Sequence, residues 1–206
     1  MKRNYDNVAI FYDRFARLIY GTALREAQVY LLKAIPPNSR ILIAGGGTGW
    51  ILEEIANIHP SGLTLTYVDS SAKMIAITKK RKAGENRVSF ITAPIQDAII
   101  DNQYDVVITP FFLDNFTDES LQKVFSRLDI RLAPKGMWFY CDFQNTDVLW
   151  QKSVLKAMYL FFRTFCGVEA SHLPDADACF AQKGYVMVAE KQFLKGFVTA
   201  RIYEKG

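Results

Sequence analysis

The stretch Arg40-Ile-Leu-Ile-Ala-Gly-Gly-Gly-Thr-Gly-Trp50 decides the fold of this chain, because it joins a short apolar run to four glycines. The run from Arg40 to Ala44 is typical of a parallel β-strand that is covered on both faces. A helix is predicted from about Gly49 to Asn57. Glycines between a strand and a helix let a ligand approach the backbone, because no Cβ intervenes. The helix start offers unpaired N–H groups to an anionic group, so the stretch predicts a ligand site.

The same alternation of apolar runs and helical patterns continues along the chain. The last two predicted strands are joined only by Leu194-Lys-Gly196, which is too short for a helical crossover, so they must be antiparallel. Right-handed crossovers elsewhere predict an α/β fold: a Rossmann-like, doubly wound, seven-stranded sheet, mostly parallel with an antiparallel C-terminal strand. Besides residues 40–44, the predicted strands are 63–68, 88–92, 105–109, 137–143, 184–193 and 197–203.

Composition limits the classes of protein to consider. A chain of 206 residues, half of them apolar, predicts a single domain over residues 1–206. The formal charge of +4 is scattered and does not favour nucleic acid as a partner. The longest uncharged run, Ile41 to Leu52, has 12 residues, whereas a membrane-spanning helix needs about 20. Cys141, Cys166 and Cys179 are odd in number and widely spaced, which favours reduced thiols in a cytoplasmic protein and no metal site.

An acid at the end of the second predicted strand narrows the class of ligand that this site can bind. Asp69 lies 20 residues after Gly49, where a carboxylate can accept hydrogen bonds from ribose hydroxyls. The glycine loop and this acid together indicate an adenosine-type cofactor. The dinucleotide fingerprint needs a further glycine at position 50, where the helix packs closely on the strand. Trp50 stands there and argues against NAD or FAD.

Four features in this order resemble the class I S-adenosylmethionine-dependent methyltransferases. They are Gly45-x-Gly47-x-Gly49 after a strand, Asp69 after the next, the Ala133-Pro-Lys-Gly136 turn before the fifth strand, and the closing hairpin. The opening segment, residues 5–13, is similar to the small-molecule branch that includes ubiquinone/menaquinone-biosynthesis methyltransferases. The resemblance covers about residues 6–204.

The resemblance implies S-adenosyl-L-methionine as cofactor, S-adenosyl-L-homocysteine as product and a small-molecule methyl acceptor as partner. It implies that the glycine loop wraps the methionine portion, that Asp69 binds the ribose, and that Ser70 and Ile95 flank the adenine. Thr109 and Pro110 are expected to line the sulfonium. The expected cofactor-binding residues are Tyr12, Ala44, Gly45, Gly46, Gly47, Gly49, Asp69, Ser70, Ile95, Thr109 and Pro110.

Two positions depart from the family pattern. Ile43 stands where the family usually has an acid on the first strand, and Ala93 where an acid commonly follows the third strand. Pro94 has no N–H to offer the adenine. These departures keep open the alternative of a non-catalytic protein that binds S-adenosylmethionine or S-adenosylhomocysteine. An NAD-dependent oxidoreductase is a further alternative, which Trp50 and the closing hairpin disfavour.

Candidate catalytic residues depend on the acceptor. A hydroxyl or ring-carbon acceptor needs a base to take its proton, and Asp114 and His172 are candidates for that base. Asp114 is expected to face the substrate, because Asp114-Asn115 occupies the place where many members of the family carry a His-His pair. Tyr12 belongs to an expected N-terminal lid helix, at about residues 5–34, where it either packs or faces the sulfonium through a cation–π contact.

A helical insertion is expected at about residues 146–167, between strands five and six. At 100° per residue, Lys152, Lys156 and Arg163 lie within about 40° of one another, and the rest of the surface is rich in aromatic residues. Three interpretations stay open: the helix covers the sheet or an apolar substrate channel, it forms a homodimer face, or residues 148–166 lie on a membrane surface. The aromatic share adds an apolar or lipid-like acceptor as a hypothesis.

Overall fold

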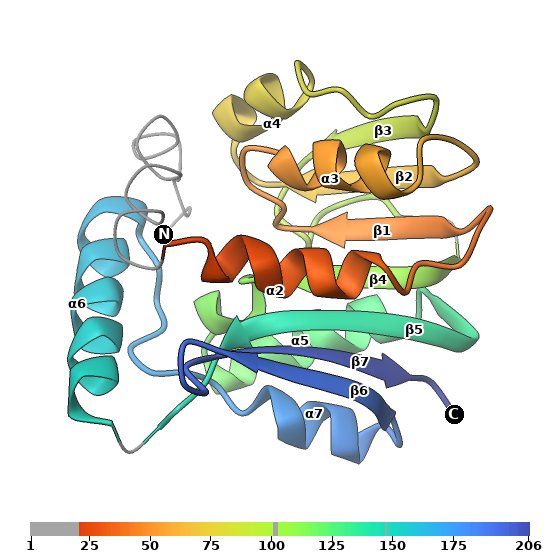
Figure 1. The fold of residues 1–206 in the computed structure, drawn as a ribbon. Coiled ribbons are helices and arrows are strands. Elements are labelled where there is room, and N and C mark those ends of the chain that lie inside the picture. Colours follow the sequence, from red (N-terminus) through yellow and green to blue (C-terminus); the bar gives the residue numbers. More distant parts are fainter. Residues whose placement is uncertain (1–20, 101–102, 147) are drawn as a thin grey trace.

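The computed structural model describes residues 21–100, 103–146 and 148–206 and contains one seven-stranded sheet with the order β3-β2-β1-β4-β5-β7-β6 (Figure 1). β7 pairs antiparallel with β5 on one side and with β6 on the other, and the pairings among the first five strands are parallel. The predicted fold class is confirmed. The strands are β1 (Arg40–Ala44), β2 (Thr64–Asp69), β3 (Arg87–Thr92), β4 (Tyr104–Pro110), β5 (Leu132–Phe143), β6 (Val186–Phe193) and β7 (Val198–Glu204).

Helices cover both faces of this sheet. Successive side chains of β1 alternate between them: Ile41 and Ile43 pack with α2 and α3, whereas Leu42 and Ala44 pack with α5 and α7. Figure 1 shows α2 and α3 in front of the sheet and α5 and α7 behind it. The helices are α2 (Ala23–Leu32), α3 (Trp50–Ile58), α4 (Ala72–Thr78), the 3-10 turn η2 (Leu113–Asn115), α5 (Asp118–Asp129), α6 (Leu149–Cys166) and α7 (Ala176–Gln182).

Hydrogen-bonding side chains fix the starts of three helices. The Ser71 hydroxyl accepts the Met74 N–H at the start of α4, and Thr117 and Ser120 form a reciprocal capping box at the start of α5. Asp175 caps α7 in the same way. The sequence did not predict α7, because its seven residues span only two turns and Cys179 and Phe180 are its main buried apolar side chains.

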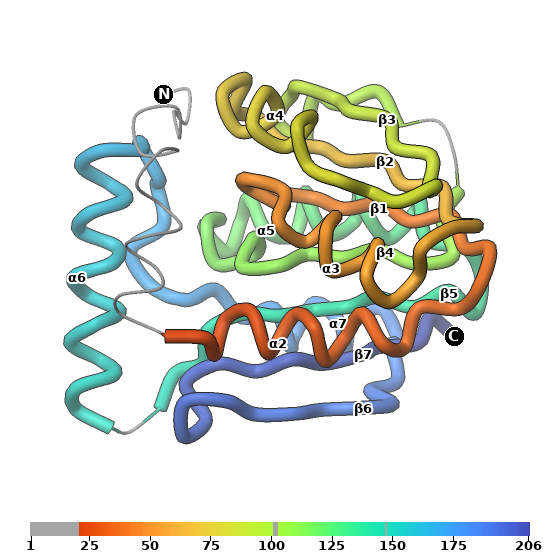
Figure 2. Tube along the Cα trace, turned by 45° about the horizontal axis from the view of Figure 1, so that its top comes forward, coloured from red at the N-terminus to blue at the C-terminus, as the bar shows by residue number. Residues whose placement is uncertain are grey.

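The switch in strand order indicates that ligands bind at the edge of the sheet where the parallel strands have their carboxyl ends. β1 lies between β2 and β4, so the connections leave its carboxyl end in opposite directions. Ligands of open α/β sheets bind at such a switch point, outside the carboxyl ends of the strands. In Figures 1 and 2, α6 stands beside this edge and away from the two helical layers. The fold therefore places the glycine loop and α6 at the same edge.

α6 lies within the expected helical insertion, and its apolar side chains divide between two environments. Leu155 and Tyr159 are buried in the cluster that also holds α2 and α3, whereas Leu149, Leu160 and Phe165 are exposed. Among residues 21–100, 103–146 and 148–206, no helix has the length and apolar character needed to cross a bilayer. Part of α6 therefore packs within the molecule, and part of its apolar surface is exposed.

α2 is the described part of the expected N-terminal lid helix. Its Ala27, Leu31 and Leu32 are buried against the sheet, in the cluster that also contains α3. The remainder of that expected helix, including Tyr12, lies outside the described residues. α2 therefore contributes to the core.

Candidate functional site

The glycine loop follows β1 and turns into α3 through left-handed backbone. Gly45, Gly47 and Gly49 have φ values of 72°, 64° and 75°, which side chains rarely adopt. The Gly45 N–H donates to the Val68 carbonyl at 2.9 Å, which ties the loop to the end of β2. Gly49 is the N-cap of α3. The loop is thereby held against the ends of two neighbouring strands.

Four glycines of the loop serve two purposes. A Cβ on Gly45 would lie 2.1 Å from the Phe112 ring, one on Gly46 would lie 2.4 Å from the Tyr67 hydroxyl, and one on Gly49 would lie 2.3 Å from Thr78 Cγ2. A Cβ on Gly47 would meet no heavy atom of the described residues within 4 Å. Gly45, Gly46 and Gly49 are therefore needed for packing, whereas Gly47 opens onto space that a ligand can occupy.

The Asp69 carboxylate lies beside this opening. Its Oδ2 accepts the Gly47 N–H at 3.2 Å, and its Oδ1 accepts the Ser71 N–H at 2.9 Å. The hydroxyls of Tyr67 and Thr78 donate to the Gly47 carbonyl at 3.1 and 3.0 Å. The residue is buried, so its carboxylate faces the loop. This arrangement puts carboxylate oxygens and bare backbone next to each other, as a ribose-bearing ligand requires.

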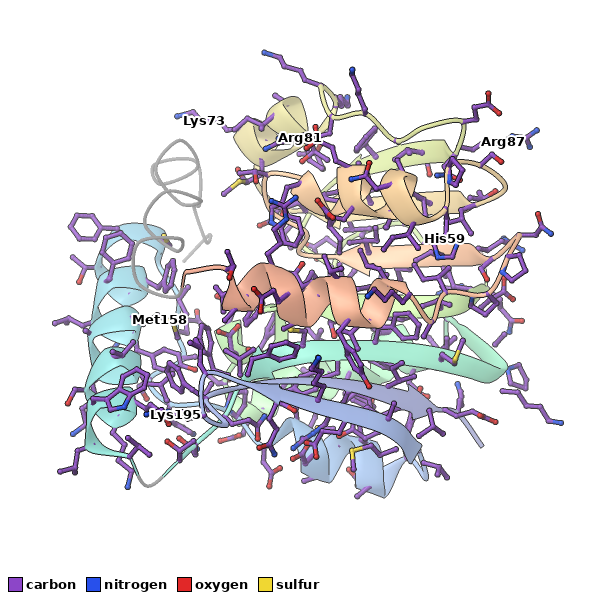
Figure 3. The ribbon with its side chains drawn as sticks, viewed as in Figure 1. His59, Lys73, Arg81, Arg87, Met158 and Lys195 are labelled. Atoms are coloured by element: carbon purple, nitrogen blue, oxygen red, sulfur yellow. The ribbon has the colours of Figure 1, made fainter. Side chains whose placement is uncertain are left out.

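The loop is also held from the side of α4. Arg81, labelled in Figure 3, donates from Nε to the Thr48 carbonyl at 3.1 Å and from Nη1 to Glu53 on α3 at 3.2 Å. These bonds connect the chain after α4 to the loop and to α3. The cationic run after α4 therefore includes one side chain that supports the glycine loop.

The residues that depart from the family pattern have structural roles. Ile43 is fully buried in the apolar cluster formed with α2 and α3. Trp50 is half-buried, and the Arg25 guanidinium lies 5.7 Å from the centre of its indole ring. Trp50 thus packs beside α2. Ala93 donates its N–H to the Asp69 carbonyl at 3.1 Å, which extends the pairing of β2 and β3.

The other expected cofactor residues lie along the same edge. Ala44 and Ile95 are buried in the apolar cluster on the α5 side, and Ser70 is exposed directly after Asp69. Thr109 is buried, and its hydroxyl accepts the Trp138 indole N–H at 2.9 Å. Pro110 ends β4. The structure thus brings the expected residues of β1, β2 and β4 to one edge.

A pocket of about 250 Å³ lies further along this edge, where β5 ends and α7 begins. Asp114, on η2, is one of its lining residues and is itself buried. The Asn115 amide donates to Asp114 Oδ1 at 2.6 Å, and the Tyr159 hydroxyl of α6 donates to the Asp114 carbonyl at 3.1 Å. Asp114 is therefore held at the pocket from two sides.

His172 lies apart from this pocket. Its Nε2 is 3.0 Å from Asp118 Oδ2 at the start of α5, and the two side chains are 63% and 60% exposed. The hydrogen bond from His172 is the largest cause that lowers the pKa of the Asp118 carboxyl below its ordinary value. Of the two candidate proton acceptors, only Asp114 lines the pocket.

Asp142 is a candidate that the sequence analysis missed. It lies near the carboxyl end of β5, is 1% exposed, and accepts the N–H groups of Asp114 and Phe143 at 3.1 and 2.9 Å. Burial raises the pKa of this carboxyl well above its ordinary value, and the neighbouring Asp114 carboxylate raises that pKa further. The available signal was an acid near the end of an otherwise apolar strand. Asp142 and Asp114 form a pair of neighbouring carboxyl groups at the pocket, in which burial and Asp114 favour the neutral form of Asp142.

Comparison with known proteins gives matches to methyltransferases. A family model described as "Methyltransferase domain" matches residues 41–136. The chain is 25% identical to the malonyl-[acyl-carrier protein] O-methyltransferase of Bacillus cytotoxicus, with 100% of this chain and 73% of that protein covered. It is 30% identical to the ubiquinone/menaquinone biosynthesis C-methyltransferase of Geotalea daltonii, with 56% and 52% covered. The chain thus spans about half to three quarters of the length of these two relatives.

Solved structures show the same fold. One of them is the N-methyltransferase NodS from Bradyrhizobium japonicum in complex with S-adenosyl-L-homocysteine, with a TM-score of 0.62 and 16% identity over 88% of this chain and 86% of that chain. The matched family model begins in β1 and includes the glycine loop, Asp69 and all of β4. With its strand order and its open glycine, the chain has the Rossmann-like fold of S-adenosylmethionine-dependent methyltransferases, and its residues 41–136 are similar to their methyltransferase domain.

Proposed function

We propose that this protein transfers the methyl group of S-adenosylmethionine to a small molecule bound at the pocket lined by Asp114. The observation that carries the proposal is the open face of Gly47 beside the buried Asp69 carboxylate. Bare backbone accommodates a ligand at close range, and a carboxylate binds ribose hydroxyls. The residues present therefore fit the cofactor, although Ile43 supplies no carboxylate for its amino group.

The residues that hold the cofactor follow from this arrangement. The glycine loop binds the methionine portion, Asp69 accepts from the ribose, and Ser70 with Ile95 flanks the adenine. Thr109 and Pro110, at the end of β4, border the position of the sulfonium. When bound, S-adenosylmethionine supplies a methyl carbon on a positively charged sulfur, which a nucleophile attacks. The protein's task is then to align the acceptor and to exclude water.

The acceptor side combines carboxylates with apolar walls. Leu113, Phe143 and Leu173 line the pocket together with the Asp114 carboxylate, and Tyr159 connects α6 to this side. The apolar walls support a small acceptor with an apolar or lipid-like part. We assign Asp114 as the group that takes a proton from the acceptor, with His172 as the second candidate. Asp114 is favoured because it lines the pocket.

Cofactor binding is tested by the rise in melting temperature that S-adenosylhomocysteine produces. We expect a rise for the wild-type protein and its loss in Asp69→Ala, because the substitution removes the ribose acceptor. Asp105→Ala is a matched control: Asp105 also accepts a backbone N–H, from Arg40, but at the opposite end of the sheet. An unchanged rise in Asp69→Ala, with NAD giving none, would mean that Asp69 does not bind the ribose.

A non-catalytic binder is the second candidate function, because Ile43 and Ala93 replace two acids of the family pattern. Such a protein would show the same rise with S-adenosylhomocysteine. Transfer of a labelled methyl group from S-adenosylmethionine to an added acceptor supports the enzyme. Labelled cofactor that remains intact with a broad panel of small acceptors would support the binder instead.

We also propose a compartment for the protein and two possible partners for its α6 surface. Cys141, Cys166 and Cys179 are buried free thiols, which supports a reducing, cytoplasmic compartment. The exposed apolar side chains of α6 keep two hypotheses for residues 148–166, a homodimer face and contact with a membrane surface. Sedimentation of the protein alone and with phospholipid vesicles separates a monomer, a homodimer and a vesicle-bound protein.

A further inference from the structure

The pocket beside η2 carries an excess of carboxylates. Four acids line it, and among the described residues its lining includes no lysine, arginine or histidine. Two of them, Asp114 and Asp142, are buried, which strengthens their interaction with any charge placed nearby. The four acids are Asp114, Asp142, Asp175 and Asp177. We call this cavity the acidic pocket.

Cationic side chains around the acidic pocket neutralise only part of this charge. Arg201 donates to Asp177 at 2.5 Å, but the same guanidinium also donates to Glu190 at 2.6 Å, so one positive charge serves two carboxylates. Asp175 accepts the Ala178 N–H at the start of α7. Asp114 and Asp142 are bonded to an amide and to backbone N–H groups in the bonds described above. Among the described residues, the acidic pocket therefore has more acids than cationic side chains bonded to them.

Tyr140 provides an independent indication that a ligand binds here. The residue is 4% exposed and lines the acidic pocket, yet its hydroxyl forms no hydrogen bond with any described residue. Burial, and then the carboxylates of Asp142 and Asp177, raise the pKa of this hydroxyl well above its ordinary value, so it stays neutral. Because this hydroxyl borders the acidic pocket and has no partner among the described residues, it is available to accept a hydrogen bond from a bound polar group.

The chemistry of the acidic pocket favours an organic cation over a metal ion or an anion. Within the described part of the chain, no group of three or more acids, histidines and cysteines is placed to hold a metal ion. Leu113, Phe143 and Leu173 add apolar wall, which suits a carbon framework. A carboxylate on the acceptor would be repelled by the four acids. An organic ammonium ion suits both parts of the lining, because its charge faces the acids and its carbon framework packs against the apolar side chains.

We propose that the methyl acceptor carries an amine, which the acidic pocket binds as an ammonium group between Tyr140 and the pair formed by Asp114 and Asp142. This inference rests on the proposed function and names its substrate class. The ammonium N–H groups donate to the carboxylates, and the Tyr140 hydroxyl oxygen accepts from the same nitrogen. The apolar walls contact the remainder of the acceptor.

The Asp114 carboxylate also provides the proton transfer that an amine requires. An ammonium nitrogen has no lone pair, so it first gives one proton to the Asp114 carboxylate. The amine nitrogen then donates its lone pair to the methyl carbon and forms the N–C bond, while the S–C electron pair stays on sulfur. The positive charge moves from sulfur to the methylated nitrogen, and no oxidant or reductant is needed.

The test compares three probes that share one ring and differ in charge: benzylamine, benzyl alcohol and benzoate. Each is titrated by calorimetry into the full chain with S-adenosylhomocysteine present. We expect benzylamine to bind at least about tenfold more tightly than the other two, because only the ammonium group satisfies the carboxylates. Equal binding of the three probes, tighter binding of benzoate, or binding of none overturns the proposal.

Three variants locate the binding. Asp142→Asn and Tyr140→Phe are each expected to weaken benzylamine binding, by about tenfold and about fivefold, since one replaces an accepting carboxyl oxygen by an amide N–H₂ and the other removes a hydroxyl. Glu119→Gln is the matched control, because it removes one exposed charge on α5, where Glu119 pairs with Lys123. Equal losses in all three variants overturn the assigned contacts.

Binding of S-adenosylhomocysteine separates a failure of the proposed substrate class from a failure of the proposed function. If the protein binds S-adenosylhomocysteine but no amine, the proposed substrate class is wrong and the proposed methyltransferase function is unaffected. A protein that binds benzylamine and no S-adenosylhomocysteine contradicts the proposed function. The melting temperature of each variant with S-adenosylhomocysteine also reports whether the variant is folded, so a misfolded Asp142→Asn is recognised and Tyr140→Phe then decides.

Discussion

The proposed cofactor side and the proposed acceptor side of this molecule are built by different means. On the cofactor side, the shape comes from the backbone: three left-handed glycines and one carboxylate arrange the loop between β1 and α3. On the acceptor side, side chains from η2, β5 and the start of α7 meet in the acidic pocket. The first depends on a continuous stretch of chain, and the second on segments far apart in the sequence.

The matched family model covers the two sides to different extents. The matched family model ends at residue 136, before Tyr140, Asp142 and α6. A backbone site tolerates few replacements, because each added Cβ meets an atom or fills the cradle. A pocket made of side chains can change its chemistry by single replacements while the sheet stays intact. We therefore expect the fold to determine the cofactor and the acidic pocket to determine the acceptor.

The largest effect is expected for Gly49→Ala. The added Cβ would lie 2.3 Å from Cγ2 and 2.7 Å from Cβ of Thr78, which is fully buried and bonded to the Gly47 carbonyl. Overpacking costs about 1–3 kcal/mol and a left-handed alanine about 1–2 kcal/mol, so the free energy of unfolding should fall by about 3 kcal/mol. Urea denaturation measures it.

Gly184→Ala is the matched control for this substitution. Gly184 has a φ of 72° and no heavy atom within 4 Å of its added Cβ, so it carries the backbone strain without the clash. We expect a loss of about 1 kcal/mol. If the two variants lost equal stability, the contact between Gly49 and Thr78 would not be the reason for a glycine at the start of α3.

Gly47→Ala is the next largest change and separates cofactor binding from stability. Its φ of 64° and open surroundings resemble those of Gly184, so both variants should lose about 1 kcal/mol of stability. Only Gly47→Ala should weaken S-adenosylhomocysteine binding in calorimetry, by about tenfold or about 1.4 kcal/mol, because its methyl group enters the cradle. Wild-type affinity in Gly47→Ala would mean that the cofactor does not lie against this glycine.

The sequence predicted the parts of the molecule that local patterns determine. The β1 bounds, 40–44, agree with the prediction. The placement of Asp69 beside the loop agrees as well, because parallel neighbouring strands bring their carboxyl ends to one edge. Periodicity and capping act within a few residues, so a single sequence carries them.

The acidic pocket could not be predicted in the same way. Asp142 stands in the apolar run of β5, and its proximity to Asp114 depends on the pairing of β4 with β5 and on the turn after β4. Tyr140 looks like an ordinary strand residue until its unpaired hydroxyl is seen in the folded chain. Their importance arises from tertiary contacts and burial, which raise pKa values without leaving a local sequence pattern.

The smallest effect is expected for His172→Ala, which removes an exposed pair with Asp118. Exposed ion pairs contribute little, so the free energy of unfolding should fall by less than about 0.5 kcal/mol near pH 5. The pKa of Asp118 is lowered in the folded protein, so the pair stabilises above the ordinary aspartate pKa of 3.8 and loses this effect as the pH falls through the lowered value. Urea denaturation at pH 5 and near pH 2 should show the difference between wild type and variant disappear.

The same variant tests the choice between Asp114 and His172. With Asp114 taking the proton, His172→Ala should keep both S-adenosylhomocysteine affinity and the rate of methyl transfer, because its ring lies at the surface beside α5. Loss of a general base lowers a rate by about a hundredfold or more. A loss of that size in His172→Ala, with cofactor affinity intact, would identify His172, in the loop before α7, as the proton acceptor in place of Asp114.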